Sequence, residues 1–270
     1  MKKSIICMLA AITIFTMAGC NNNETKTSSV GEGQEASGEG TQSGKETLIV
    51  GTEAGFAPYE YMEGDKVVGI DMDIAQEIAN SMGRTLEIKN MDFDGALLAV
   101  QQGKVDFVAA GVSVDEERKA VMDFSMNYVD SIEVIVVNQS APRVSGTEGS
   151  DLNGKIVGVQ QGNIADIWVS NKENCEPAEI KRYTKFAQAA EDLKNEKIDC
   201  IVMDQFPAQE LVKASEGTLT ILEGEPLFSD QYAIAVQKGN QELLDEINTV
   251  IQRLIDEGKI EEFTANHTAQ

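Results

Sequence analysis

Residues 86–109, LEIKNMDFDGALLAVQQGKVDFVA, change from an apolar strand pattern to an amphipathic helix pattern and back. We expect strands at residues 86–89 and 105–109 and, between them, a helix at residues 94–102 that ends at Gly103. A strand, a helix and a second strand in this order are typical of parallel strands joined by a helical crossover. The stretch therefore predicts an α/β fold.

The pattern continues toward the N-terminus. A first strand is expected at residues 48–51 and an extended piece at residues 67–70. A helix follows at residues 71–82, with Asp71 as its cap and Gly83 as its stop. Together with residues 86–109 these segments form a βαβαβ unit.

A second unit of the same order lies further along the chain. It consists of strand 156–159, helix 164–170, strand 180–183, helix 186–195 and strand 198–203. Phe93 and Asp106 recur as Phe186 and Asp199 at one common spacing, which indicates a pseudo-repeat. Two such units predict two lobes, each a mostly parallel sheet flanked by helices.

Two apolar runs, residues 132–137 and 232–236, separate these units from the rest of the chain. An amphipathic helix with seven large apolar residues between 243 and 255 follows the second run. If this helix returns to the first lobe, the two runs are hinge strands. We therefore assign residues 46–131 and 230–270 to lobe 1 and residues 132–229 to lobe 2.

The N-terminus has the pattern of a secretory signal. Lys2 and Lys3 precede an apolar run at residues 5–17. This run is shorter than the roughly 20 apolar residues that a membrane-spanning helix needs. Small residues precede Cys20, and the segment resembles a bacterial lipoprotein signal, although Met17 stands where leucine is more frequent. We expect a signal peptide at residues 1–19 and lipidation of Cys20, with an ordinary signal or an uncleaved anchor as the alternatives.

Residues 20–45 are almost entirely polar and are expected to form a flexible tether. The protein would then lie outside the cytoplasm, anchored by its lipid to the bacterial cell membrane. The formal net charge of −23 offers no electrostatic basis for binding nucleic acid or anionic lipid. We expect a monomer that contacts the membrane through its lipid.

Cysteine and histidine usage limits the possible chemistry. Apart from Cys7 and Cys20, the chain has Cys175 and Cys200, whose spacing leaves open whether they form a disulfide. The single histidine, His267, makes a histidine-based catalytic or metal site improbable. The Asp-x-Asp at 71–73 is better explained by a helix start than by a metal. We predict no catalytic residue, no metal and no cofactor.

Ligands of open parallel sheets lie beyond the carboxyl ends of the strands. The segments at those ends carry a series of motifs: GTE at 51–53, FAPY at 56–59, GIDMD at 69–73, DFD at 92–94, GVS at 111–113 followed by Arg118, and VGVQQG at 157–162. In this order, over about residues 46–265, the motifs resemble the polar-amino-acid-binding proteins of ABC transporters. The resemblance implies a periplasmic-binding-protein fold and the delivery of a free amino acid to ABC transporter membrane subunits.

The resemblance also implies how the amino acid is held. Arg118 would clamp the ligand α-carboxylate through a bidentate pair, flanked by Ser113 and the backbone of Gly111. The helix start at Asn163 and Ile164 would add N–H groups. Both residues replace hydroxyl residues that are common there. The alternative for the arginine is a solvated side chain paired with a neighbouring glutamate.

Asp204 would receive the ligand ammonium group, with a plain helix cap as the alternative. Phe56 and Phe93 would form the walls around the ligand side chain, although phenylalanine is more often a core residue. Gln160 and Ala110 follow strands at the same edge and complete the predicted set.

Glu53 bears on specificity. The equivalent position is acidic in relatives that take lysine, arginine or ornithine and also in glutamine binders. A cation between two aromatic rings and beside a carboxylate gains cation–π attraction. The pair Ala110 and Gly111, by contrast, is similar to the glutamine type, so both ligand classes remain open.

Two other functions share this fold. A dehydratase acting on a prephenate-like acid needs a general acid in the cleft, for which Glu53 is the candidate. A protein that presents its ligand to a sensory receptor needs no chemistry at all. Neither is favoured over transport.

Overall fold

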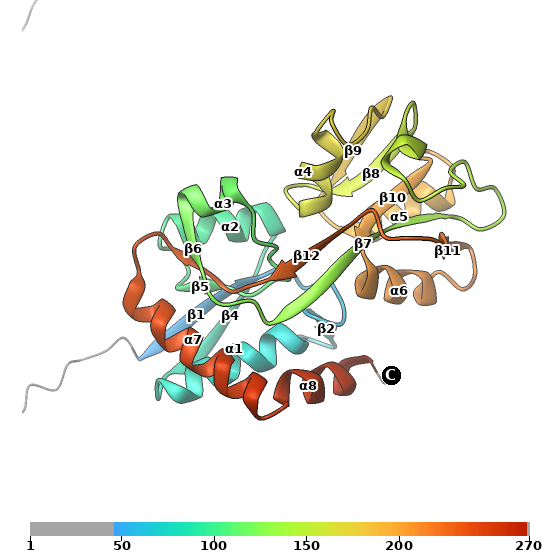
Figure 1. Ribbon diagram of the computed structural model, residues 1–270. Helices are drawn as coiled ribbons and strands as arrows, with labels where there is room; N and C mark the ends of the chain where they lie inside the picture. Colours follow the sequence, from blue (N-terminus) through green and yellow to red (C-terminus); the bar gives the residue numbers. More distant parts are fainter. Residues whose placement is uncertain (1–45, 269–270) are drawn as a thin grey trace, which may run out of the picture. The chain divides into compact units, whose positions relative to one another are not determined.

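The computed structural model describes residues 46–268, which form two β-sheets flanked by helices and a short separate hairpin (Figure 1). The predicted signal peptide at residues 1–19, the lipidation site Cys20 and the tether at residues 20–45 lie outside the described residues.

The first sheet combines parallel and antiparallel strands. Its order is β4 (Thr85–Asn90), β1 (Thr47–Thr52), β5 (Phe107–Val108), β13 (Ala235–Gln237) and β6 (Met122–Phe124). β1 pairs with β4 and β5 in parallel, as expected for the first unit. β13 pairs antiparallel with β5 and β6. The chain thus returns from residue 235 into the sheet that it started, as predicted for the second apolar run.

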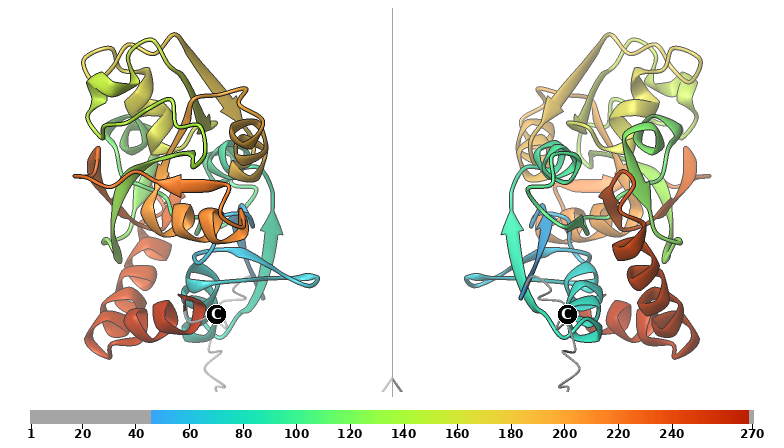
Figure 2. Two further views of the ribbon diagram at one scale, coloured as in Figure 1. Left: turned by 90° about the vertical axis from the view of Figure 1, so that its right-hand side faces the viewer. Right: turned by 90° about the vertical axis from the view of Figure 1, so that its left-hand side faces the viewer.

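Alternation along the strands explains how helices cover both faces of this sheet. Phe107 and Ala109 are buried in the apolar cluster that includes α1 (Ile70–Ser81), whereas Val108 is buried in the cluster of α2 (Phe93–Gln101). α7 (Gln241–Asp256) and α8 (Lys259–Thr268) pack against α1. α3 (Glu116–Val121) precedes β6, and the hairpin β2 (Tyr61–Glu63) and β3 (Lys66–Val68) projects beside the sheet (Figure 2).

The second sheet has the order β11 (Leu219–Ile221), β7 (Val129–Asn138), β10 (Cys200–Asp204), β8 (Ile156–Gln160) and β9 (Glu179–Tyr183), and β12 (Phe228–Tyr232) also pairs with β7. β8 is parallel to β9 and β10, whereas the partners of β7 are all antiparallel. α4 (Ile164–Ser170) packs against β8, β9 and β10. α5 (Phe186–Lys194) and α6 (Gln205–Ala214) also pack on this sheet, and a 3-10 turn spans Gly149–Leu152.

β7 and β12 run side by side as the two connections between the sheets (Figure 1). Their antiparallel register joins Phe228 to Glu133 at one end and Tyr232 to Val129 at the other. β7 therefore begins three residues before its predicted run, toward the first sheet. β12 lies before the run predicted at 232–236 and shares only Tyr232 with it, because residues 235–237 already belong to β13 of the first sheet. The largest buried apolar cluster contains residues of both sheets.

Two expectations about the helices change with the structure. Asp71 does not cap α1, because Gly69 occupies the cap position and no side chain caps the helix. Asp71 instead accepts hydrogen bonds from the Gly111 N–H (2.8 Å) and the Tyr128 hydroxyl (2.7 Å). α8 follows α7 as a separate helix that the sequence pattern did not predict.

Cys175 and Cys200 are both free and both buried in one apolar cluster, so the disulfide left open by the sequence is not formed. Among residues 46–268, none of the helices has the length and apolar character that a membrane crossing requires.

Candidate functional site

Arg118 is almost fully buried, so the alternative of a solvated arginine paired with a neighbouring glutamate is wrong. Its Nε lies 3.1 Å from Asp115 Oδ2, and one Nη donates to the Ser113 carbonyl. The other Nη donates over 2.7 Å to the carbonyl of Gly162, which precedes α4 on the second sheet. Burial lowers the pKa of Arg118, and the nearby aspartates oppose this effect. The guanidinium therefore already bridges the two lobes.

Local structure positions this arginine. Asp115 caps α3 by accepting the N–H groups of Glu117 (2.8 Å) and Arg118 (3.0 Å). The guanidinium lies 5.6 Å from the centre of the Phe93 ring, a cation–π contact. The chain turns at Gly111, whose φ of 54° is readily adopted by glycine, before it reaches Ser113 and Arg118.

A narrow cavity, too small to admit a water molecule, lies between the lobes. It is lined by Glu53, Phe56, Glu60, Phe93, Ala110, Gln160 and Asn163. All of these except Glu60 belong to the predicted site, and they come from both sheets. The structure therefore brings together side chains that are more than a hundred residues apart in the sequence.

Glu53 forms the end of this cavity and is 1% exposed. Its carboxylate accepts a hydrogen bond from Gln160 Nε2 (3.0 Å) and lies 3.3 Å from Lys185 Nζ. Burial raises the pKa of Glu53, while Gln160 and Lys185 counteract the rise. Glu60 is equally buried beside it, and burial raises its pKa further. Two carboxylates thus line one small cavity.

The aromatic walls are arranged differently from a simple pair. The ring of Phe56 stacks on Tyr59, at 5.9 Å between centroids, and on Phe186 of α5, at 6.1 Å. Phe93 lies against Arg118 instead. Both phenylalanines line the cavity, but Phe186 is an additional aromatic partner contributed by the second lobe.

Asp204 ends β10 and occupies the cap position of α6, yet its side chain makes no capping hydrogen bond. The alternative of a plain helix cap is therefore wrong. Its carboxylate accepts the hydroxyls of Tyr232 and Ser131 (3.2 Å from Ser131 Oγ) and lies 3.5 Å from the amide nitrogen of Asn163. These bonds fix a buried carboxylate beside Asn163, which lines the cavity.

The start of α4 offers less to an anion than the sequence suggested. The side-chain oxygen of Asn163 accepts the Ala165 N–H (2.8 Å), and the Gly162 N–H donates to Asp166 (3.1 Å). The Asn163 N–H donates to the Gln160 carbonyl. Of the N–H groups from 162 to 165, only that of Ile164 has no such use in the described structure.

The lobes are in direct contact in this structure. Besides the bonds of Arg118 and Glu53, Gln161 Nε2 donates to Asp94 (2.5 Å) across the cleft. The cavity has no room for a water molecule, whereas small-molecule pockets begin at roughly 300 Å³. A ligand must therefore separate the lobes and replace some of these bonds.

Several residues of the site were not predicted. Lys185 and Glu60 are ordinary charged residues in the sequence, and only their burial or contacts mark them. Glu133 carried a detectable signal, because it is the one charged residue in the apolar run 132–137. Asp230, two residues before the second run, lies beside it.

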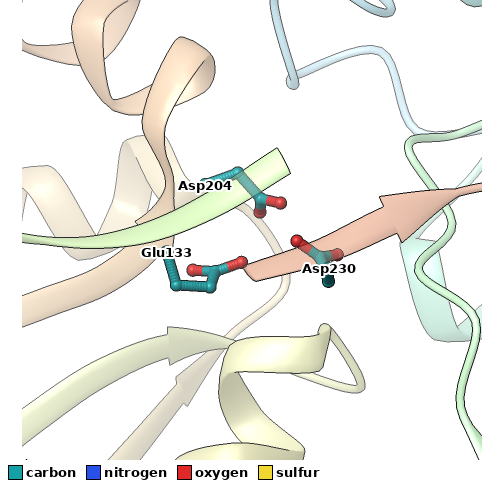
Figure 3. Close-up of side chains that lie close together, drawn as sticks. All are labelled: Glu133, Asp204 and Asp230. Atoms are coloured by element: carbon teal, nitrogen blue, oxygen red, sulfur yellow. The ribbon is translucent and has the colours of Figure 1, made fainter. Parts of the chain in front are cut away.

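Glu133, Asp204 and Asp230 place carboxylate oxygens within 4.8 Å of one another (Figure 3). In the part of the chain that the structure describes, this is the group of acidic side chains that meets the geometric requirement for a metal ion.

Comparison with known proteins places this geometry in a family. Residues 48–270 match the profile of the bacterial extracellular solute-binding proteins, family 3. The arginine-binding extracellular protein ArtP of Bacillus subtilis is 28% identical over 264 residues, which cover 97% of this chain and 96% of ArtP.

Solved structures of arginine-binding proteins have a similar fold. A mutant of ArgBP from T. maritima is 36% identical and superposes with a TM-score of 0.77, covering 83% of this chain and 96% of that one. An ancestral arginine-binding protein, solved with arginine, is 36% identical with a TM-score of 0.76, covering 83% of this chain and 99% of its own. An ancestral arginine-binding protein solved with glutamine is 35% identical with a TM-score of 0.76, covering 84% of this chain and 99% of its own.

Proposed function

Since the chain belongs to the bacterial extracellular solute-binding proteins of family 3, we propose that it captures arginine or a similar cationic amino acid and delivers it to an ABC transporter. The carrying observation is an interlobe cavity lined by the buried carboxylates of Glu53 and Glu60. The buried guanidinium of Arg118 contacts its lining residue Phe93, and the buried carboxylate of Asp204 contacts its lining residue Asn163. That arrangement complements a zwitterion with a cationic side chain.

The ends of such a ligand have separate partners. The α-carboxylate accepts hydrogen bonds from Arg118, which exchanges its bond to the Gly162 carbonyl for the ligand. The Ile164 N–H and the region of Ser113 complete this end. The α-ammonium donates to the carboxylate of Asp204, which lies at the carboxyl end of β10.

The cationic head extends toward Glu53, past Phe56 and Phe93. Gln160 and Lys185 contact Glu53 in this structure, so a guanidinium would take over part of their role. Once a ligand displaces Lys185, Glu53 is a buried carboxylate without a positive partner, which is costly and favours a cation there over a neutral amide. ArtP and the ancestral protein, named for arginine, support the same choice.

Closure is the working step. The two connections, β7 and β12, let the lobes separate, and a ligand that contacts both lobes stabilises the closed state. The transporter's membrane subunits would recognise that state. This function needs binding without chemistry, and the solute-binding family supports it over a dehydratase.

A calorimetric panel of the twenty amino acids plus ornithine and cystine tests the proposal on the purified protein. We expect arginine to bind most tightly, with lysine or ornithine next and glutamine weaker. If none of these compounds binds, the proposed function is wrong. If glutamine binds more tightly than arginine, amino-acid capture stands and the cationic preference is wrong.

The isosteric substitution Glu53→Gln separates binding from catalysis. It should lower arginine affinity by about tenfold, because it removes a charge-assisted bond of about 1.5 kcal/mol or more. Glu63→Gln, at an exposed position in β2, is the matched control and should leave affinity unchanged. Conversion of any panel compound to a product by the unmodified protein would instead support an enzyme.

The anchor is a separate part of the proposal. We propose that the mature chain is a monomer lipidated at Cys20. Expressed in a bacterium, Cys20→Ala should move the protein from the membrane fraction to the soluble or secreted fraction, whereas Cys7→Ala should not. Membrane association that survives Cys20→Ala would favour the uncleaved anchor.

A further inference from the structure

Three acidic side chains converge on one face of the second sheet. Glu133 of β7 pairs directly with Asp204 of β10 in the strand register, and Asp230 of β12 lies two residues from the partner of Glu133. Figure 3 shows their carboxyl groups pointing toward one another, with oxygens within 4.8 Å. The strands themselves therefore hold these groups together.

Glu133 is the decisive member. It is fully buried, and neither of its carboxylate oxygens has a hydrogen-bond donor within residues 46–268. The group that it faces is the carboxylate of Asp204, which cannot donate unless it keeps a proton. A buried carboxylate that lacks a donor is unfavourable by several kcal/mol. It needs a cation or a proton.

The charges do not balance with an amino acid alone. The ligand ammonium neutralises one of the three carboxylates, and the nearby Arg118 is balanced by the ligand carboxylate. Two negative charges remain in a buried cluster. One divalent cation would neutralise them.

We propose that Glu133, Asp204 and Asp230 form a binding site for a divalent cation, with Ca²⁺ as the preferred ion. The three side chains offer only oxygen atoms, and the hydroxyls of Ser131 and Tyr232, both bonded to Asp204, add two more. Hard oxygen donors without nitrogen or sulfur select Ca²⁺, Mg²⁺ or Mn²⁺.

The donor arrangement favours Ca²⁺ over Mg²⁺. Both carboxylate oxygens of Glu133 lack a hydrogen-bond donor, and the side chain of Ser113 is the donor near Asp230. These oxygens suit the six to eight irregularly placed ligands that Ca²⁺ accepts. Mg²⁺ demands near-octahedral geometry and retains several waters.

An entry path exists. A cavity of about 930 Å³ beside the connecting strands is lined by Ser131 and Asp230 at its inner side and by Trp168 and Phe228 of the second lobe. This cavity offers hydrated ions a route to Asp230 that does not pass through the amino-acid cleft. Both carboxylate oxygens of Asp230 are buried in this structure, so its side chain must move to bind an ion.

The direct test is calorimetric titration of chelator-treated protein with Ca²⁺ in the absence of amino acids. We expect one ion per chain with a dissociation constant on the order of 10⁻⁴ M, the range of extracellular calcium modules, and weaker binding of Mg²⁺. Glu133→Gln keeps the side-chain shape and should weaken Ca²⁺ at least tenfold. Asp130→Asn is the matched control, because Asp130 lies on the same strand, is exposed and bonds to Gln231.

A luminescence measurement locates the ion. Trp168 is the only tryptophan of the chain, and its ring stacks at 5.1 Å on Phe228, the strand partner of Glu133. Terbium bound at the cluster should show emission sensitised by Trp168 and Tyr232, which Ca²⁺ displaces and Glu133→Gln abolishes.

Misfolding of the variant is checked by its melting temperature in chelator, which should equal or exceed that of the unmodified protein, since Glu133→Gln relieves repulsion. The Ca²⁺-induced rise in melting temperature should then be absent from this variant and present in Asp130→Asn. No Ca²⁺ binding, or binding that Glu133→Gln leaves unchanged, would overturn the proposal and assign the balancing charge to protons. Either result leaves the amino-acid panel unaffected.

Discussion

The ammonium group of Lys185 lies 3.3 Å from the carboxylate of Glu53, so the second lobe already places a cation at the end of the cleft where a ligand cation is expected. Lys185 is partly exposed, whereas Glu53 is buried. The lysine can therefore withdraw into solvent when a guanidinium arrives, which the buried glutamate cannot do. This pair sets how strongly the site prefers a cation over an amide.

Replacing Lys185 by alanine should shift that preference toward arginine. The guanidinium no longer competes with Nζ, so arginine affinity should rise about two- to fivefold, the range of a partly exposed ion pair. Glutamine affinity should fall, because Glu53 loses its balancing charge. Calorimetry with arginine and with glutamine gives the ratio of the two affinities. Lys181→Ala, which removes a lysine paired with Asp192 outside the cavity, should leave the ratio unchanged. A ratio that stays constant in Lys185→Ala would contradict this assignment.

Arg118→Lys tests the carboxylate clamp while keeping the charge. A lysine cannot provide the two parallel bonds that the guanidinium offers the ligand carboxylate once it has exchanged its bond to the Gly162 carbonyl. Two charge-assisted bonds are worth about 3 kcal/mol or more, so every amino acid should bind at least a hundredfold more weakly. Arg182→Lys, at a pair with Asp166 in the second lobe, is the control. Affinity within a few-fold of the original in Arg118→Lys would show that the clamp lies elsewhere.

The parts of the fold that depend on local pattern were predictable. The strands and helices of both βαβαβ units follow from apolar spacing, and α4 lies at the predicted residues. The antiparallel strands β6 and β11 are only three residues long, so no periodicity marks them. Their positions depend on tertiary pairing with β13 and β7.

The residues of the candidate site also fall into predictable and unpredictable ones. Arg118 and Asp204 were recognisable because motifs surround them, and the structure buries both. Lys185 was not, because a lysine before a helix has no distinctive pattern until Glu53 is placed opposite. Asp71 was misread as a cap for a related reason. Its true partners, Gly111 and Tyr128, are distant in sequence, and only folding reveals them.

Gly111→Ala should damage the site by moving Phe56. Gly111 has a φ of 54°, and a Cβ atom there would lie 2.7 Å from Phe56 Cε1. The ring must shift away from the cavity, so we expect weaker binding and a loss of roughly 1–3 kcal/mol in the free energy of unfolding. Ligand affinity and chemical denaturation measure the two effects.

Gly64→Ala is the matched control for backbone strain. Gly64 has a similar φ of 64° in the β2–β3 turn, but a Cβ atom there meets nothing within 4 Å. It should lose some stability and no affinity. Equal loss of affinity in both variants would mean that strain, rather than the Phe56 contact, disturbs the cleft.

The buried acids should make the ligand-free protein more stable at mildly acidic pH than at neutral pH. Burial raises the pKa of Asp71 to about 6 and that of Asp230 to about 7, above their unfolded value of 3.8. Between pH 3.8 and these raised pKa values, the folded state binds more protons than the unfolded state. The free energy of unfolding therefore falls as pH rises. The slope is about 1.4 kcal/mol per pH unit for each such proton. The melting temperature, recorded in chelator, should therefore decrease from pH 5 to pH 8.

Asp230→Asn should flatten the upper part of this dependence, from about pH 6 to pH 8, because it removes the group with a pKa of about 7. Asp192→Asn is the informative control: three hydrogen bonds, the strongest from Lys181, hold the pKa of Asp192 below its usual range. The contribution of Asp192 to the free energy of unfolding is complete above its unfolded pKa of 3.8 and is lost only in stronger acid. The slope between pH 5 and pH 8 should thus survive Asp192→Asn, and a melting temperature that rises over this range in the unmodified protein would refute the assignment of protons to the buried acids.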